Sequence, residues 1–283
     1  MFPGPHLVTV LCATGCAVSL GACAPPAPEL GTVDYTAVDP PRLCAPGEKP
    51  GSAGGANRIL TSHEIPFSVR TPANYDATRA HPLLVMFAPG GKHRYESERF
   101  YGMTRQATSA GFIVAYPDHL KLSLRAFEEL GQVPELIAGG WCVDPQRVYF
   151  AGHSDGGTTS AAVTFLARSS LPPRAIVVSG AGIRRQDLEQ HACPAPVSVM
   201  VIHSRADSLF PLPAFGRDAA GWWAACGRCG EPSAPPDAHG CVHFQACASG
   251  AEVRYCETTG PHAKWQVSNA ALLAFLTARL PDR

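Results

Sequence analysis

The sequence predicts an α/β fold in which a mainly parallel sheet is flanked by crossover helices. Short apolar runs alternate with helix-competent stretches from about residue 58 onwards. Runs such as Leu83–Ala88 are apolar throughout, which is typical of strands that are buried on both faces. The 283 residues suffice for one large domain with a well-buried core, and no internal repeat divides them.

Each expected strand is a short run of branched or aromatic apolar residues with turn residues at its ends. Thr71-Pro72, for example, ends the first run. These runs are Ile65–Arg70, Leu83–Ala88, Phe112–Tyr116, Val148–Ala151, Ala175–Ser179, Val197–His203 and Val253–Cys256. The longer stretches between and after them are expected to be helical. They are Glu96–Ala110, Lys121–Ala138, Ser154–Arg168, Phe215–Ala225 and Ser268–Leu280.

The charge balance excludes some classes of partner. The chain has 23 Lys and Arg residues against 23 Asp and Glu residues, so its formal net charge is zero. A neutral chain offers no electrostatic basis for binding nucleic acid or an anionic membrane surface. We expect a monomer.

The cysteine count indicates an oxidising compartment. Of 11 cysteines, Cys12, Cys16 and Cys23 lie near the N-terminus, and the other eight follow from Cys44 onwards. An even eight in an exported chain predicts four disulfides. The alternative is a zinc site built from Cys226-x-x-Cys229 with Cys241 or His243.

The N-terminus predicts export. Leu7–Ala22 is apolar or small and uncharged, which suits the core of a signal peptide, although Met1–His6 has no Lys or Arg. Leu20-Gly21-Ala22-Cys23 resembles a bacterial lipobox, so Cys23 is a candidate for lipidation. We therefore divide the chain into a leader (1–23), a linker and irregular segment (24–57) and a folded domain (58–283).

One motif predicts a nucleophile. Gly152-x-Ser154-x-Gly156 follows an apolar strand and precedes the helix-competent Thr158–Arg168. This is the context of a nucleophile elbow, in which a strained turn holds the serine hydroxyl clear at the carboxyl end of a sheet. Residues two before and two after must then lack Cβ atoms. The alternative is a glycine-rich connecting turn.

A serine nucleophile needs a base and an orienting carboxylate. In folds that present the serine on such an elbow, the chain order is Ser, then the acid, then His. Asp207 lies just beyond the strand Val197–His203 and is the predicted acid. Asp187 and Glu189 lie in a polar stretch and are interpreted as solvated.

His262 is the predicted base, because it follows the strand Val253–Cys256 and the turn Thr259-Gly260-Pro261. His239 and His243 lie in a cysteine-rich segment and are interpreted as surface or packing residues. His153 precedes the nucleophile and is expected to pack beside the pocket or shape it.

Two backbone segments are candidates for the oxyanion hole, the pair of N–H donors that stabilises the negative oxygen of a tetrahedral intermediate. One is the N–H of Asp155, directly after the nucleophile. The other lies in Pro89-Gly90-Gly91, where Gly90 or Gly91 lets an amide approach the substrate oxygen. A plain β-turn is the alternative reading of this loop.

These motifs together resemble the secreted polyhydroxybutyrate depolymerases, feruloyl esterases and LpqC-like lipoproteins, from about Ile65 to the C-terminus. The resemblance rests on Pro82–Val85, Cys142–Tyr149 with the serine motif, Pro196–His203 with Asp207, Trp223-x-x-Cys226, Cys247-x-x-Gly250 and Gly260-Pro261-His262-x-x-Trp265. It implies an α/β-hydrolase fold, no cofactor, and a triad at Ser154, Asp207 and His262.

The chain departs from this family in two places. Ala88-Pro89 stands where the family often has His-Gly, and Cys226–Cys256 carries more cysteines than we expect. Our interpretation joins Cys142 with Cys193, and pairs Cys226 or Cys229 with Cys241 or Cys247.

The resemblance implies a carboxylic ester substrate. Between Ser179 and Val197 there is room for a loop but not for a cap domain, so an open site and a bulky or polymeric ester are expected. Tyr101, Trp141 and Trp265 are the aromatic candidates for substrate contact. An exported peptidase with the same triad and a binding protein without activity are the competing hypotheses.

Overall fold

The computed structural model describes residues 28–38 and 40–278, and its centre is a nine-stranded sheet in the order β1-β2-β4-β3-β5-β6-β7-β9-β8. Strands β4, β3, β5, β6, β7 and β9 run parallel, whereas β1, β2 and β8 pair antiparallel with their neighbours. The strands are β1 (Ala56–Leu60), β2 (Pro66–Arg70), β3 (His81–Phe87), β4 (Ile113–Pro117), β5 (Val143–His153), β6 (Ala175–Ser179), β7 (Ser198–Ser204), β8 (Cys241–Phe244) and β9 (Val253–Thr258).

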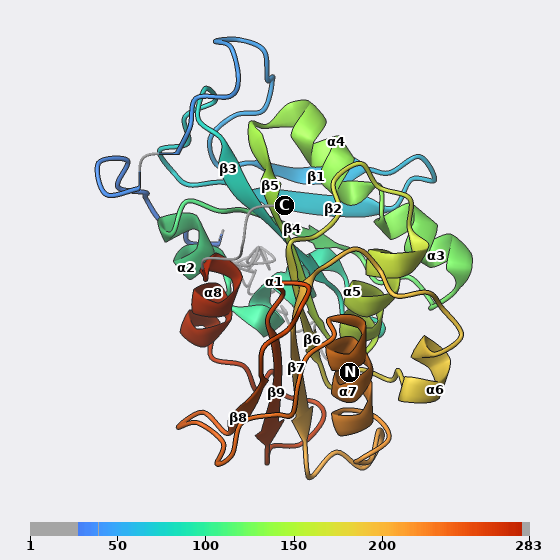
Figure 1. Cartoon of the computed structure of the whole chain (residues 1–283). Helices are drawn as coiled ribbons and strands as arrows, with labels where there is room; N and C mark the ends of the chain where they lie inside the picture. The colour runs from blue at the N-terminus through green and yellow to red at the C-terminus, as the bar shows by residue number, and fades with distance from the viewer. Residues whose placement is uncertain (1–27, 39, 279–283) are drawn as a thin grey trace, which may run out of the picture.

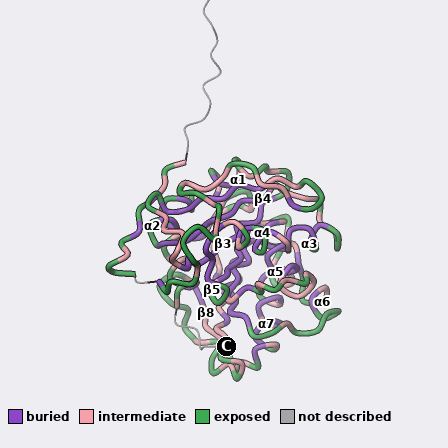
Figure 2. The backbone as a smooth tube through the Cα atoms, turned by 90° about the horizontal axis from the view of Figure 1, so that it is seen from above, coloured by how far each residue is buried: buried purple, intermediate pink, exposed green. Residues whose placement is uncertain are grey.

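Helices cover both faces of this sheet (Figure 1). They are α1 (Arg94–Tyr101), α2 (Thr104–Ser109), α3 (Leu124–Leu130), α4 (Val133–Gly140), α5 (Asp155–Leu166), α6 (Arg185–Leu188), α7 (Arg217–Cys226) and α8 (Asn269–Thr277). One apolar core lies beneath α3, α4, α5, α6 and α7, and the other lies beneath α1, α2 and α8. Figure 2 shows the resulting buried centre inside a shell of exposed loops.

Strand β3 shows why its sequence is apolar throughout. Leu83, Val85 and Phe87 belong to the core under α5, whereas Leu84 and Met86 belong to the core on the opposite face. Since side chains alternate along a strand, only a strand covered on both faces needs apolar residues at every position. This arrangement places the carboxyl ends of the parallel strands along one edge, where the loops that carry chemistry begin.

Two predicted helices are each divided in the structure. The helix expected over 96–110 breaks at Gly102, which takes a left-handed conformation (φ 56°) and ends α1. The helix expected over 121–138 breaks at Gly131, and Pro134 starts α4 in its first turn. Two edge strands, β1 and β8, were not predicted, because half-exposed edge strands lack a continuous apolar run.

Four disulfides form from the eight described cysteines, as the even count predicts: Cys44–Cys142, Cys193–Cys226, Cys229–Cys247 and Cys241–Cys256. Joining Cys142 with Cys193 was wrong. Cys142 directly precedes β5 and meets the irregular N-terminal segment, whereas Cys193 follows α6, which packs on α7 where Cys226 lies. Cys229–Cys247 is one of the pairings that the sequence left open.

The disulfides exclude the zinc alternative, since Cys226, Cys229 and Cys241 are all bonded to other cysteines. In the described part of the chain, His, Cys, Asp and Glu side chains nowhere gather in threes in a way that could hold a metal ion. Four disulfides indicate a protein that folds outside the reducing cytoplasm.

The segment before β1 packs on the domain. Val33 is buried, and the backbone N–H of Gly31 donates to Thr108 Oγ1 on α2 at 2.7 Å. The leader and Cys23 lie outside the described residues. Within residues 28–38 and 40–278, no helix has both the length and the apolar character needed to cross a bilayer.

Candidate active site

Ser154 occupies a strained turn between β5 and α5. Its backbone lies at φ 56° and ψ −124°, a conformation that a residue with a side chain rarely adopts. The glycines of the motif are sterically required. A Cβ on Gly152 would lie 2.2 Å from the carbonyl oxygen of Gly156, and one on Gly156 would lie 2.1 Å from that of Phe87. The turn therefore has the local geometry of a nucleophile elbow.

The structure brings together Ser154, His262 and Asp207, which come from three different strand ends. His262 Nε2 lies 2.9 Å from Ser154 Oγ, and His262 Nδ1 lies 2.6 Å from Asp207 Oδ2. An ionised carboxylate only accepts hydrogen bonds, so Nδ1 carries the proton and donates to Asp207. Nε2 is then free to accept the proton of the Ser154 hydroxyl, as a general base must.

The surroundings of Asp207 keep it ionised and fixed. The backbone N–H groups of Leu209 and Phe210 both donate to Oδ1, at 3.0 and 2.9 Å. Burial works to raise the pKa of Asp207, but the Phe210 N–H and the His262 side chain outweigh burial, and the pKa lies below its usual value. Burial lowers the pKa of the neighbouring His203, whose Nε2 donates to the carbonyl of Phe210 at 2.7 Å. This second histidine thus fixes the loop that presents the acid.

The loop that carries His262 is held from several sides. The Ser204 hydroxyl donates to the carbonyl of Gly260 at 2.6 Å, and the Gln266 amide bonds both the N–H and the carbonyl of Gly260. His153 Nε2 donates to the carbonyl of His262 itself at 2.6 Å. Burial lowers the pKa of His153 to about 4, so His153 is neutral at physiological pH. The expected packing role of His153 therefore includes a direct bond to the backbone of the base.

The candidate oxyanion loop, Pro89-Gly90-Gly91, lies against the turn that carries Ser154. A Cβ on Gly90 would lie 3.1 Å from Asp155 Oδ2, whereas a Cβ on Gly91 would meet nothing within 4 Å. The loop is also a β-turn, because the Lys92 N–H donates to the Pro89 carbonyl at 3.1 Å. Tyr101 fixes the end of β3, where this loop begins: its hydroxyl donates to the Phe87 carbonyl and accepts from the His153 N–H. Of the two candidate glycines, Gly90 is the one that lies beside Asp155.

The three aromatic candidates lie in different places. Tyr101 is 1% exposed and Trp141 is 6% exposed, so both are core residues and the expectation that they contact substrate was wrong. Trp141 lies two residues before the start of β5, at the opposite end of the sheet from Ser154. Trp265 remains half-buried with its ring centroid 6.2 Å from that of His153. Phe210, which the sequence did not single out, packs its ring 5.2 Å from that of His262.

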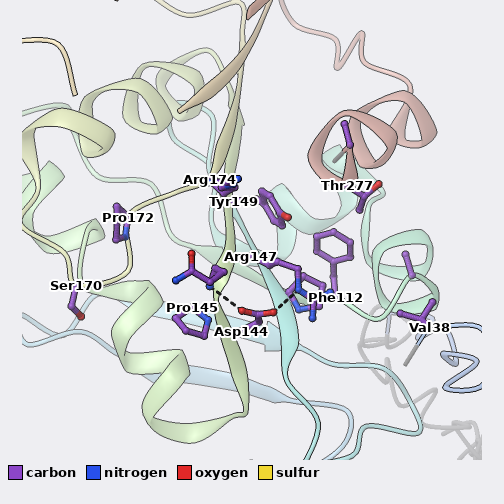
Figure 3. Close-up of a pocket in the computed structure, with 14 residues that line it drawn as sticks. Val38, Phe112, Asp144, Pro145, Arg147, Tyr149, Ser170, Pro172, Arg174 and Thr277 are labelled. Carbon is purple, nitrogen blue, oxygen red and sulfur yellow. Dashed lines mark hydrogen bonds and ion pairs between the residues drawn. The ribbon is translucent and has the colours of Figure 1, made fainter. Parts of the chain in front are cut away.

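A separate pocket of about 1020 Å³ lies at the other end of the sheet (Figure 3). Its lining includes residues at the amino ends of strands, such as Pro82, Phe112 and Arg174, and the end of α8 at Thr277. Within it Arg147 donates to the Asp144 carboxylate at 2.6 Å, which ties down the start of β5. Ser154 lies beyond the opposite end of β5, so this pocket does not belong to the candidate active site.

Comparison with models of protein families finds no match, and neither does comparison with curated protein sequences. Solved structures are similar. An acetyl xylan esterase from Aspergillus awamori matches with a TM-score of 0.61 and 11% identity over 80% of this chain and 99% of that one. The esterase Est2 from Thermogutta terrifontis matches with a TM-score of 0.50 and 12% identity over 79% and 89%.

A putative dipeptidyl aminopeptidase IV from Bacteroides ovatus matches with a TM-score of 0.53 and 14% identity over 77% of this chain and 34% of that one. Likeness at such low identity reports the fold. Together with the strand order and the helices on both faces of the sheet, it shows that the chain has the α/β-hydrolase fold predicted from its sequence.

Proposed function

We propose that this chain is an exported serine esterase that hydrolyses carboxylic esters through an acyl-enzyme on Ser154. The observation that carries the proposal is the continuous relay of hydrogen bonds from Ser154 through His262 to Asp207. Two of the similar structures are named as esterases and one as a putative dipeptidyl aminopeptidase, so the test has to include both ester and amide substrates.

The chemistry follows from the relay. His262 Nε2 takes the Ser154 proton as Oγ bonds to the ester carbonyl carbon, and the carbonyl oxygen becomes an oxyanion. The N–H groups of Asp155 and Gly90 are the donors proposed for that oxygen. His262 then gives its proton to the departing alkoxide, which leaves as an alcohol. Water, deprotonated by the same histidine, releases the acid and restores Ser154.

An accessible site favours bulky or polymeric esters. Between β6 and β7 the described chain forms only the four-residue helix α6, which is too small to cap the site. Hydroxyalkanoate polyesters and feruloyl or acetyl esters of polysaccharide are the proposed substrates. The Aspergillus awamori neighbour, named as an acetyl xylan esterase, makes acetylated xylan a necessary member of any test panel.

The deciding experiment measures product release from acetylated xylan, feruloylated arabinoxylan, amorphous polyhydroxybutyrate and p-nitrophenyl esters, with a dipeptidyl p-nitroanilide as the peptidase control. We expect ester turnover by the wild type and none by Ser154→Ala. Turnover of the anilide alone would show that the chain is a peptidase. Equal rates for wild type and Ser154→Ala would exclude catalysis by Ser154 and favour the hypothesis of a binding protein without activity.

We also propose that residues 1–23 direct export, in keeping with the four disulfides of the domain, and that cleavage before Cys23 leaves its sulfur to be lipidated. Expression of the full chain in a bacterial host, followed by membrane fractionation, tests this. Wild type should sediment with membranes and Cys23→Ser should not. Equal release of both into the medium would exclude the lipid anchor.

A further inference from the structure

His119 contacts Asp155, the residue directly after the proposed nucleophile. His119 lies in the loop after β4, and its Nε2 lies 2.9 Å from Asp155 Oδ2. Both side chains are partly buried, with 18% and 30% of their surfaces exposed. The carboxylate of Asp155 also borders the oxyanion loop at Gly90. A charged group thus lies between the two segments proposed to stabilise the oxyanion.

The loop that carries His119 is anchored to the start of α1. The His119 N–H donates at 3.1 Å to the carbonyl of Lys92, the residue that follows Gly91 and closes the β-turn of the candidate oxyanion loop. Asp118 accepts from the Arg94 N–H at 2.6 Å and pairs with the Arg94 guanidinium at 3.1 Å. His119 is therefore fixed by its backbone to one half of the proposed oxyanion hole and by its side chain to the other.

The charge at Asp155 makes this contact consequential. A carboxylate beside the oxyanion hole repels the negative charge that develops on the substrate oxygen, and such repulsion is strong in a partly desolvated site. An N–H donated by His119 holds the carboxylate in place and offsets its charge. The His119–Asp155 hydrogen bond shares no atom with the bonds that join His262 to Ser154 and Asp207, so the pair is separate from the proposed proton relay.

We propose that His119 is a positioning residue that keeps the Asp155 carboxylate paired and thereby sustains oxyanion stabilisation. The proposal rests on the proposed function. It predicts that losing the histidine is harmful only while the carboxylate is charged, so His119→Ala should cost far more activity in the wild type than in Asp155→Asn.

The test compares His119→Ala, His119→Gln, Asp155→Asn and the double variant His119→Ala/Asp155→Asn, on a p-nitrophenyl ester. Titration with a fluorescent organophosphonate, which labels the active serine, normalises each rate to functional protein. The exposed His239, replaced by Ala, is the matched control histidine. Inhibition by an aryl boronate, whose adduct carries the negative oxygen, reports the oxyanion hole independently of turnover.

We expect kcat of His119→Ala to fall at least about tenfold, with KM within about twofold and boronate affinity reduced in parallel. His119→Gln, which keeps an N–H donor, should stay within about threefold of the wild type. In the Asp155→Asn background, His119→Ala should lower kcat by no more than about threefold. A His119→Ala enzyme as fast as wild type, or a loss from His119→Ala that is as large in Asp155→Asn as in the wild type, would overturn the proposal. An inert wild type would instead contradict the esterase function itself.

Discussion

His153 Nε2 lies 2.6 Å from the carbonyl oxygen of His262, so the residue before the nucleophile holds the backbone of the residue that is proposed to activate it. Its other ring nitrogen, Nδ1, accepts from the Ser179 hydroxyl at 3.0 Å. The imidazole is buried and locked in one orientation from both sides. It links β5, β6 and the loop after β9.

This link predicts a kinetic effect of His153 without contact with the reacting atoms. His153→Ala should lower kcat about tenfold to a hundredfold, because small displacements of a general base are costly. His153→Gln, which can still donate to the His262 carbonyl, should retain more activity than His153→Ala. The measurement is kcat per titrated active site. Equal rates for Ala and Gln would show that the hydrogen bond is unimportant.

The buried His153 also predicts how stability depends on pH. Burial lowers the pKa of His153 to about 4, so between its ordinary value near 6.5 and pH 4 the unfolded chain binds more protons than the folded one. The free energy of unfolding therefore falls as the pH drops through this window, by up to about 3 kcal/mol from this residue. The groups that face it, His262, Asp207 and His203, set its environment.

Denaturant unfolding at pH 7 and at pH 4 measures this effect. His153→Gln cannot take up the proton, so it should lose less stability across the window than the wild type. If both proteins lose the same free energy, His153 does not contribute to the acid sensitivity. Buried His203, whose pKa is also lowered, offers a second variant for the same comparison.

Much of the site could be predicted because it depends on local pattern and chain order. A Gly-x-Ser-x-Gly turn after an apolar strand fixes where Ser154 lies, and parallel strands deliver Asp207 and His262 to the same edge. His119 had no such signal, because its contact with Asp155 spans 36 residues and depends on how the loop after β4 folds back. The disulfide partner of Cys142 could not be predicted from the sequence either, because Cys44 lies in an irregular segment.

The proposed triad predicts large and unequal losses. Ser154→Ala and His262→Ala should each lose at least about 10³-fold in turnover, and Asp207→Asn somewhat less, because the base remains present. Asp187→Asn is the matched control, since Asp187 pairs with Arg184 on the surface and does not approach His262. Steady-state kinetics on a p-nitrophenyl ester gives the answer. An active Asp207→Asn beside an inactive Asp187→Asn would reverse the assignment of the acid.

The glycines of the serine turn predict a stability effect that does not depend on catalysis. Gly156→Ala would push a methyl group into the carbonyl oxygen of Phe87, and backbone cannot move aside easily. We expect a loss of at least about 3 kcal/mol in the free energy of unfolding. Gly139→Ala is the control: it lies in α4 with open space around its Cβ, so it should gain up to about 1 kcal/mol.

The disulfides differ in the length of chain that they enclose, and this difference predicts how much each contributes to the free energy of unfolding. Cys44–Cys142 joins residues 98 positions apart, whereas Cys241–Cys256 joins residues 15 apart on neighbouring strands. A cross-link stabilises the fold mainly by restricting the unfolded chain, and the restriction grows with the loop. Replacing both cysteines of the first pair by Ala should therefore cost more stability, by about 1 to 2 kcal/mol, than the same change in the second.

Thermal melting of the two double variants, with and without reductant, checks this order. Reductant should lower the melting temperature of the wild type and should lower it less for the variant that lacks Cys44–Cys142. If full reduction left the melting temperature of the wild type unchanged, the disulfides would not contribute to its stability. A larger loss from the Cys241–Cys256 variant would instead show that pinning the edge strand β8 onto β9 matters more than the enclosed loop.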